Sequence, residues 1–162
     1  MSELVLRNRQ RVRAVNTLLL RRIVRSLLTD FVGVENYELG LHLLSGPQIT
    51  RLNETFLRHA GSTDVITFDY SEFGTRNSEL LSIHGEVFVC VDEAARQARR
   101  FRTTWQSELV RYIVHGVLHL LGHDDQRPAA RRKMKREENR LLRDLAACFP
   151  LSQLARRLKL RA

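Results

Sequence analysis

Cysteine is scarce in this chain of 162 residues, which has only Cys90 and Cys148. The two form no CxxC pair, so a cysteine-based metal or redox motif is not indicated. Cys90 lies in an apolar, strand-like pattern, and we expect both thiols to be buried in a reducing compartment.

Long apolar runs are absent as well. No stretch approaches the roughly 20 residues that a membrane-spanning helix requires. The first ten residues lack a long apolar segment and charged residues soon follow, so we expect no signal peptide. There is no internal repeat or low-complexity tract, and 162 residues suffice to bury a core. We predict a single cytoplasmic domain over residues 1–162, with no membrane partner.

One apolar helix carries two histidines four residues apart, His115 and His119. Residues at i and i+4 lie on one helical face, so both imidazoles point the same way. Most of their neighbours are apolar, and burying an unpaired polar ring costs free energy. A metal ion would give both rings a partner. A buried polar cluster without a metal is the alternative.

A third ligand has to come from the chain after the helix. Gly122 follows, and glycine commonly lies just past a helix end because it adopts the left-handed conformation without a Cβ penalty. A continued helix would place His123 about 12 Å along the axis from His115, too far to share an ion. We predict Asp125 as the third ligand, with His123 as second choice and Asp124 as a weaker candidate. Two histidines and a carboxylate leave a position for water, as in catalytic zinc sites.

The segment His-Gly-Val-Leu-His-Leu-Leu-Gly-His-Asp-Asp, residues 115–125, resembles the His-Gly-x-Leu-His-Leu-x-Gly-Tyr-Asp-His signature of the YbeY family. That family comprises metal-dependent endoribonucleases that act as rRNA maturation factors. Two further segments, residues 52–68 and 84–89, resemble family segments in the same order. The resemblance implies one zinc ion, single-stranded rRNA as substrate and the ribosomal subunit or its proteins as partners. It also implies a small mixed β-sheet covered by helices, with the metal helix lining a cleft.

Three positions depart from the family pattern. Asp125 stands where the family usually has histidine, and carboxylate oxygen is an acceptable zinc ligand, so the resemblance implies a retained site of altered affinity. His123 stands where the family usually has tyrosine. A family arginine thought to act near the site falls on Leu57, and the neighbouring Arg58, about 100° further round a helix, is our candidate phosphate contact.

The net charge of +9 is unevenly distributed along the chain. Residues 1–126 hold 15 Lys/Arg and 15 Asp/Glu, whereas residues 127–162 hold 12 and 3. The basic excess therefore follows the metal motif directly and includes a basic tail over about residues 150–162. Cations beside a hydrolytic site suit a polyanionic substrate such as RNA. A solvated helix face that aids solubility is the alternative.

Hydrophobic periodicity and turn residues predict the remaining elements. Strands are predicted at residues 4–6, 37–44, 65–68 and 86–91, helices at 11–30, 49–59, 92–101 and 127–147, a turn at Gly46-Pro47 and a loop at 69–81. Asp92 is a plausible N-cap. Glu86 is expected to be a strand-edge carboxylate rather than a catalytic base. This alternation predicts a single-domain α/β sandwich.

The sequence favours one reaction class. Common zinc proteases carry a general-base glutamate directly after the first histidine, where this chain has Gly116. Phosphodiester hydrolysis needs a metal ion and cations that hold the phosphate. We therefore predict a metal-dependent endoribonuclease that uses activated water. The alternatives are a non-catalytic ribosome-assembly or RNA-binding factor with a structural metal, and a metallopeptidase.

Overall fold

A computed structural model describes residues 2–58, 61–71 and 80–156, with a mixed four-stranded sheet at its centre. In spatial order the strands are β1 (Glu3–Asn8), β2 (Asn36–Leu44), β4 (Ser82–Cys90) and β3 (Val65–Asp69). Strands β1, β2 and β4 are parallel, and β3 runs antiparallel to β4. The predicted mixed sheet is confirmed, with β1 and β3 as its edges.

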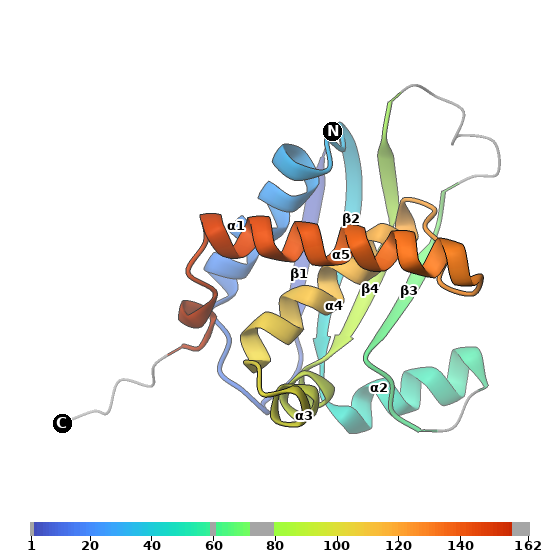
Figure 1. The fold of residues 1–162 in the computed structure, drawn as a ribbon. Coiled ribbons are helices and arrows are strands. Elements are labelled where there is room, and N and C mark those ends of the chain that lie inside the picture. The colour runs from blue at the N-terminus through green and yellow to red at the C-terminus, as the bar shows by residue number, and fades with distance from the viewer. Residues whose placement is uncertain (1, 59–60, 72–79, 157–162) are drawn as a thin grey trace.

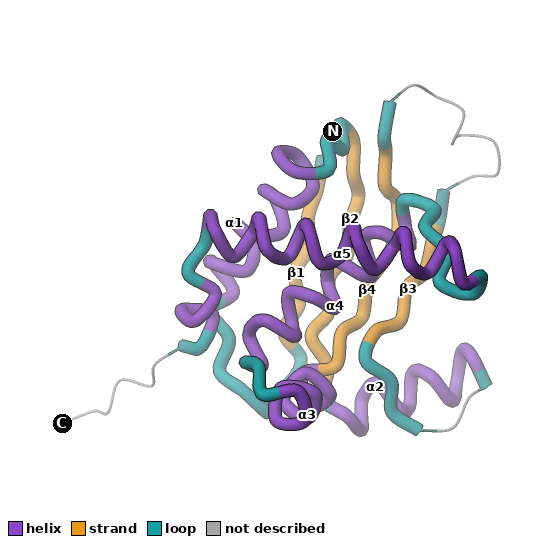
Figure 2. Tube along the Cα trace, viewed as in Figure 1, coloured by secondary structure: helices purple, strands orange, loops and turns teal. Residues whose placement is uncertain are grey.

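The helices gather mainly on one face of the sheet. They are α1 (Thr17–Ser26) with the π-helical turn η1 (Leu27–Phe31), α2 (Gly46–Leu52) with the π-helical turn η2 (Asn53–Leu57), α3 (Val91–Phe101), α4 (Trp105–Leu120), α5 (Pro128–Cys148) and the short 3-10 helix η4 (Leu151–Leu154). Figure 1 shows α1, α4 and α5 in front of the strands, with α5 crossing over α4. Figure 2 shows α2 and α3 together at one end of the sheet.

Alternation along the strands divides the core between the two faces. Leu39, Leu41 and Leu43 of β2 point toward α1 and α4 and belong to the main apolar cluster. The opposite face carries a smaller cluster beneath α2, which includes Cys90. Cys90 is buried as predicted, whereas Cys148 is exposed because it ends α5, so the prediction of two buried thiols is wrong for Cys148.

Two glycines allow α4 to lie close to the sheet. A Cβ atom on Gly116 would come within 2.6 Å of Val87 Cγ1. On the sheet side, a Cβ atom on Gly85 would lie 2.9 Å from Leu120 Cδ2 and would clash with the backbone oxygen of Phe68. Any larger side chain at either position would push the helix away from β4 or distort the strands.

The start of the first helix differs from the prediction. Helix α1 begins at Thr17 rather than at residue 11, and Asn16 caps it by accepting the Leu19 N–H at 3.1 Å. Residues 11–13 instead form a bend whose backbone is bonded by the buried side chain of Gln10. A side-chain amide that bonds the backbone offers the chain an alternative to helix, and the apolar spacing does not reveal this.

The predicted turn at Gly46-Pro47 is also wrong, because both residues lie in the first turn of α2. Ser45 and Gln48 form a capping box there, and proline is well tolerated in a first helical turn. Asp92 does not cap α3, which begins at Val91; its carboxylate accepts the Gly46 N–H instead.

Other boundaries differ by smaller amounts. Strand β4 starts at Ser82, earlier than the predicted residue 86, so Glu86 lies within the strand rather than at its end. The predicted loop over 69–81 lies partly outside the described residues, as do the predicted end of the second helix at residue 59 and residues 157–162. None of the described helices is long and apolar enough to cross a membrane.

Part of the predicted basic tail packs against the body of the protein. Leu154 is buried, and its carbonyl accepts the Asn16 N–H at 2.8 Å. A β-bridge joins Val15 to Ala155. These contacts attach residues 151–156 to the segment that precedes α1.

Candidate metal centre

The end of α4 brings its two histidines together as predicted. The rings of His115 and His119 lie at 82° to each other, and their Nε2 atoms are 3.0 Å apart. Both side chains are partly exposed because they lie on the helical face that does not contact the sheet. Their alignment follows from the i, i+4 spacing alone.

The chain reverses directly after α4. Gly122 has a φ of +97°, which confirms the left-handed position predicted for it. The Gly122 N–H donates to His119 O at 2.9 Å, and the His123 N–H donates to Leu118 O at 3.0 Å. These two bonds form a Schellman motif. The reversal carries Asp125 back to the histidines, with its Oδ2 3.3 Å from His119 Nε2 and 3.7 Å from His115 Nε2.

Hydrogen bonds determine which ring nitrogens carry protons. His119 Nδ1 lies 3.1 Å from the carbonyl oxygen of His123, which can only accept, so Nδ1 is the donor. His115 Nδ1 lies 3.0 Å from a carboxylate oxygen of Glu138 and donates to it in the same way. In the neutral rings, both Nε2 atoms therefore present lone pairs to each other and to Asp125. Three acceptors converge with no proton between them, an arrangement that a shared cation stabilises.

The spacing of these three atoms fits a small divalent ion. Zinc bonds of about 2.0–2.1 Å in a tetrahedron separate neighbouring ligand atoms by about 3.3–3.4 Å. The observed separations of 3.0, 3.3 and 3.7 Å bracket that value. Among the described residues, His115, His119 and Asp125 are the one group of three or more such side chains compact enough to hold a metal ion. We call these three side chains the metal triad.

The other candidates from the sequence lie outside the triad. His123 contributes its main-chain carbonyl to His119, and burial together with the charge of Lys133 lowers the pKa of its ring. Asp124 accepts the Gln126 N–H at 2.8 Å and so orders the turn. Arg58 is exposed at the end of η2 with a φ of +53°, and within the described ranges no hydrogen bond or ion pair joins it to the triad.

Glu138 is a functional residue that the sequence analysis missed. It is 4% exposed on α5 and accepts from His115 Nδ1 and from Arg111 Nη1, both at 3.0 Å. Burial alone would raise the pKa of its carboxyl, but the hydrogen bonds from His115 and Arg111, together with the charge of Lys135, outweigh burial and hold the pKa at about 2. Glu138 is therefore an anion that orients the His115 ring.

A sequence signal for Glu138 does exist. It occupies a buried stripe of α5 otherwise formed by Met134, Leu141, Leu142 and Leu145. A carboxylate at helical spacing within an apolar stripe requires a buried partner. The partner could not be identified without knowing that α5 crosses α4 (Figure 1). The pairing also acts on His115: burial lowers the pKa of the ring, but the hydrogen bond to Glu138 and the charges of nearby carboxylates together outweigh burial and raise the pKa.

A cavity of about 700 Å³ adjoins the triad, which confirms the predicted cleft beside the metal helix. His115 and Asp125 line it together with residues of α3 and α5. Arg131 and Lys135 of α5 also line the cavity and bring cations to it. Such a space admits a substrate much larger than water.

Gly116 faces away from this cavity. Its hypothetical Cβ would contact Val87 and Thr67 of the sheet, and the position is buried. A glutamate there would point into the core rather than toward the triad. The packing therefore gives a physical reason why this helix cannot carry the general base of a common zinc protease.

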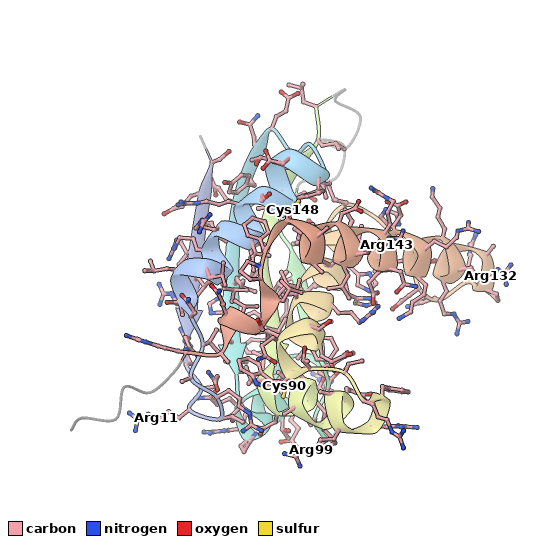
Figure 3. The ribbon with its side chains drawn as sticks, turned by 60° about the vertical axis from the view of Figure 1, so that its left-hand side comes forward. Arg11, Cys90, Arg99, Arg132, Arg143 and Cys148 are labelled. Atoms are coloured by element: carbon pink, nitrogen blue, oxygen red, sulfur yellow. The ribbon has the colours of Figure 1, made fainter. Side chains whose placement is uncertain are left out.

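Helix α5 also presents an exposed basic surface. Figure 3 shows Arg132 and Arg143 projecting from its outer side. Arg140 is paired with Glu137 and Asp144, whereas Arg131, Arg132 and Lys133 have no ion pair in the part of the chain that the structure describes. The free cations are concentrated near the start of α5, where the chain leaves the triad.

Several known proteins resemble this chain in sequence. The sequence profile of the family described as "Endoribonuclease YbeY" matches residues 5–146. The chain is 38% identical to Endoribonuclease YbeY of Chlorobium phaeovibrioides over 135 residues, covering 83% of this chain and 86% of that protein. It is 37% identical to Endoribonuclease YbeY of Salinibacter ruber over 123 residues, covering 75% and 78%.

The fold has a counterpart among solved structures. The solution structure of TM1509 from Thermotoga maritima superimposes with a TM-score of 0.66 and covers 93% of this chain and 94% of that one. Its sequence is 22% identical, so this likeness concerns the fold alone. Because the profile spans most of the chain and the relatives match most of their own length, the chain belongs to the Endoribonuclease YbeY family.

Proposed function

We propose that this protein is a zinc-dependent endoribonuclease that hydrolyses single-stranded RNA during rRNA maturation in the cytoplasm. The observation that carries the proposal is the convergence of three acceptor atoms, from His115, His119 and Asp125, beside a cavity of about 700 Å³. The relatives' name, endoribonuclease, supports RNA as the substrate. The single-domain organisation over residues 1–162 belongs to the same proposal.

Each residue of the centre has a defined task. The two Nε2 atoms and Asp125 Oδ2 would hold the ion, and Glu138 keeps His115 in the orientation that leaves its Nε2 available to a metal. Zinc, when bound, would supply Lewis acidity toward a phosphoryl oxygen and lower the pKa of a water molecule. The carbonyl of His123 holds the ring of His119 in the corresponding orientation. In this hydrolysis, water adds its hydroxyl to phosphorus, the P–O bond to one ribose breaks, and the departing ribose oxygen takes up the proton.

Cations along the cavity position the RNA backbone. Arg131 and Lys135 line it, and free cations continue along the exposed side of α5. Arg58 remains our candidate for a further phosphate contact, made by a segment of RNA that passes η2. Phosphate contacts of this kind fix the position of a strand without reading its sequence. Ribosomal RNA in a ribosomal subunit, together with ribosomal proteins, is the proposed setting.

The experiment compares substrates under one set of conditions. Zinc-loaded protein is incubated with a single-stranded RNA, the same RNA in a duplex, and a peptide mixture, and products are analysed by size. We expect internal cleavage of the single strand, weak or no cleavage of the duplex and none of the peptides, with RNA binding that weakens steeply as salt rises. Peptide cleavage, or RNA binding without cleavage, would favour the peptidase or the assembly-factor alternative respectively.

A further inference from the structure

A second basic surface lies on the face of the sheet opposite to α4. Two adjoining hollows of about 380 and 410 Å³ share Arg9 and Gln48 in their linings. Arg51 lines the first and Arg11 the second. Phe88 also lines the first hollow; it alternates along β4 with Val87 and Val89, which point into the main core, so it faces away from α4. We call the two hollows together the arginine trough.

The arginine trough is separate from the basic surface of α5. In Figure 3, Arg11 lies at the opposite side of the molecule from Arg132. The residues that line the trough all come from residues 1–126, a part of the chain in which the numbers of basic and acidic residues are equal. Folding brings Arg9 and Arg11 beside Arg51, which is about 40 positions away in the chain. The structure therefore concentrates cations that the sequence disperses.

The three arginines of the trough lack acidic partners. Arg9, Arg11 and Arg51 are exposed, and none forms an ion pair within the described ranges. No carboxylate of a described residue lines either hollow. The carboxylate of Asp92, which is close to the start of α2, is bonded to the Gly46 N–H. A trough with free guanidinium groups and no carboxylate in its own lining attracts phosphate or carboxylate ligands.

The loop that carries Arg9 and Arg11 is fixed by the residue between them. Gln10 is 6% exposed, and its Oε1 accepts the N–H groups of Val12 and Arg13 at 2.8 and 3.0 Å. Its Nε2 donates to Asn8 Oδ1 and Arg13 O. A buried amide with four hydrogen bonds holds the loop in one conformation. Binding therefore costs little ordering of the backbone.

A further bond ties this loop to the helix that carries Arg51. Gln48 Nε2 donates to Arg9 O at 2.8 Å, while the Arg9 N–H donates to Leu43 O at 3.0 Å. The backbone of Arg9 is thus held both by α2 and by β2. The positions from which Arg9 and Arg51 project are fixed relative to each other before any ligand arrives.

An exposed aromatic ring completes the arginine trough. Phe56 lines it and is 64% exposed, although a phenyl ring gains free energy on burial. The ring of Phe68 contacts the Phe56 ring in a T-shaped arrangement, with the two ring centroids 6.1 Å apart. At 64% exposure, much of the Phe56 side chain is open to a ligand. Free arginines next to an open aromatic ring suit single-stranded nucleic acid, whose phosphates pair with guanidinium groups and whose bases stack on aromatics.

We propose that the arginine trough binds a segment of single-stranded RNA, with phosphates at Arg9, Arg11 and Arg51 and a base stacked on Phe56. The choice of RNA over DNA rests on the proposed function, whereas the trough itself does not depend on the metal centre. The protein would then hold its RNA at two surfaces, the cavity beside α5 and the trough behind the sheet.

The test measures binding of a fluorescent single-stranded RNA by the full chain carrying His119→Ala, so that cleavage does not consume the probe. Arg9→Gln/Arg51→Gln is compared with Arg25→Gln/Arg99→Gln, which removes the same charge from exposed arginines of α1 and α3. We expect the trough variant to bind more weakly, with a logarithmic salt slope less steep by about 1.4 because two phosphates are no longer neutralised. The control variant should keep the slope.

Phe56→Leu should weaken binding about fivefold or more, with little change in slope.

Equal affinity and equal salt slope in the trough and control variants would overturn the proposal. Binding of polyglutamate to the same variants is measured alongside. If the trough variant loses polyglutamate binding but keeps RNA binding, the proposal is overturned too, because the trough would then be a docking surface for an acidic protein. Cleavage by the zinc-loaded parent chain is measured separately. If cleavage is absent while the trough variant still weakens binding, the proposed function fails and the arginine trough stands. If the parent chain cleaves RNA while the trough variant binds as tightly as the control, the proposed function stands and the trough proposal fails.

Discussion

At the scale of single residues, the ring of His115 is held by a carboxylate from another helix. Glu138 on α5 accepts its Nδ1 proton and is itself held by Arg111 and Lys135. Partners of this kind fix the tautomer and raise the basicity of a metal-binding histidine. The affinity of the metal triad should therefore depend on a residue that is not a ligand.

Glu138→Gln tests this dependence. The substitution keeps the shape of the side chain but removes its charge, so the preference of His115 for a free Nε2 weakens. We expect zinc affinity to fall about 10- to 100-fold, measured by competition with a chromophoric chelator. Glu137→Gln, on the neighbouring residue that pairs with Arg140, is the control and should leave affinity unchanged. Equal affinities for the two variants would show that Glu138 does not support the triad.

The same carboxylate predicts a pH effect on the metal-free protein. Its pKa is about 2 in the folded chain against an ordinary 4.5, so the folded state favours the anion. The resulting stability is fully present above about pH 4.5 and is lost as pH falls toward 2. Between pH 5 and 3, urea unfolding should therefore show a larger loss of stability for the wild type than for Glu138→Gln, by on the order of 1–2 kcal/mol. Parallel curves for the two proteins would contradict the prediction.

The sequence predicted the local part of the centre and missed the part that depends on tertiary packing. His115 and His119 share a face through helical spacing, and Gly122 indicated the reversal that returns Asp125. Each relation spans about ten residues or fewer along the chain. Glu138 reaches His115 only because two helices cross, and no local pattern encodes that crossing.

At the scale of elements, the approach of α4 to the sheet depends on Gly116. A Cβ atom there would lie 2.6 and 3.1 Å from the two γ-methyl carbons of Val87, which is itself fully buried. Overpacking of a core typically costs about 1–3 kcal/mol. The spacing between helix and strand in turn sets where the histidines lie above the cavity.

Gly116→Ala should therefore lower the free energy of unfolding by about 1–3 kcal/mol, measured by urea denaturation. Adding Val87→Ala removes both clashing methyl groups, so the double variant should be more stable than the sum of the two single effects predicts. Simple additivity would mean that contact with Val87 is not the cause.

The positions of the helix ends show why hydrophobic periodicity alone could not predict the element boundaries. All four strands and the main helices were predicted, because apolar spacing identifies their buried faces. The starts of α1 and α2 were wrong because Gln10 and Ser45 decide them through hydrogen bonds to the backbone. Caps override an apolar pattern at helix ends, where backbone N–H groups need partners.

At the scale of the whole molecule, the order of the strands and the distribution of charge over the surface could not be predicted from the sequence. Strand β4 lies between β2 and β3, and its pairing with β2 joins segments far apart in the chain, such as Asn36 and Ser82. Counting charges along the chain located the basic excess after residue 126. It did not reveal the arginines that meet on the far face of the sheet, because acidic residues elsewhere in residues 1–126 balance them in number. Both features exist only once distant segments are placed together.

The basic side of α5 leads to a prediction at this scale. Arg132 and Lys133 are exposed near the start of the helix and have no ion pair among the described residues. Replacing both with glutamine should weaken RNA binding at low salt and reduce the logarithmic salt slope by about 0.7 for each phosphate that is no longer neutralised. Zinc content should not change, because neither residue touches the triad. A salt slope equal to that of the wild type would show that this side of α5 does not contact RNA.

The central claim is that the metal triad performs the cleavage of RNA. The most direct test measures zinc content and single-stranded RNA cleavage on the same preparations of wild type, His119→Ala, Asp125→Ala and His123→Ala. We predict that wild type and His123→Ala bind one zinc ion per chain and cleave, since the hydrogen bond from His123 to the triad is made by its main-chain carbonyl and does not need its ring. His119→Ala and Asp125→Ala should lose zinc and cleavage together. Undiminished cleavage by zinc-free His119→Ala would contradict the account.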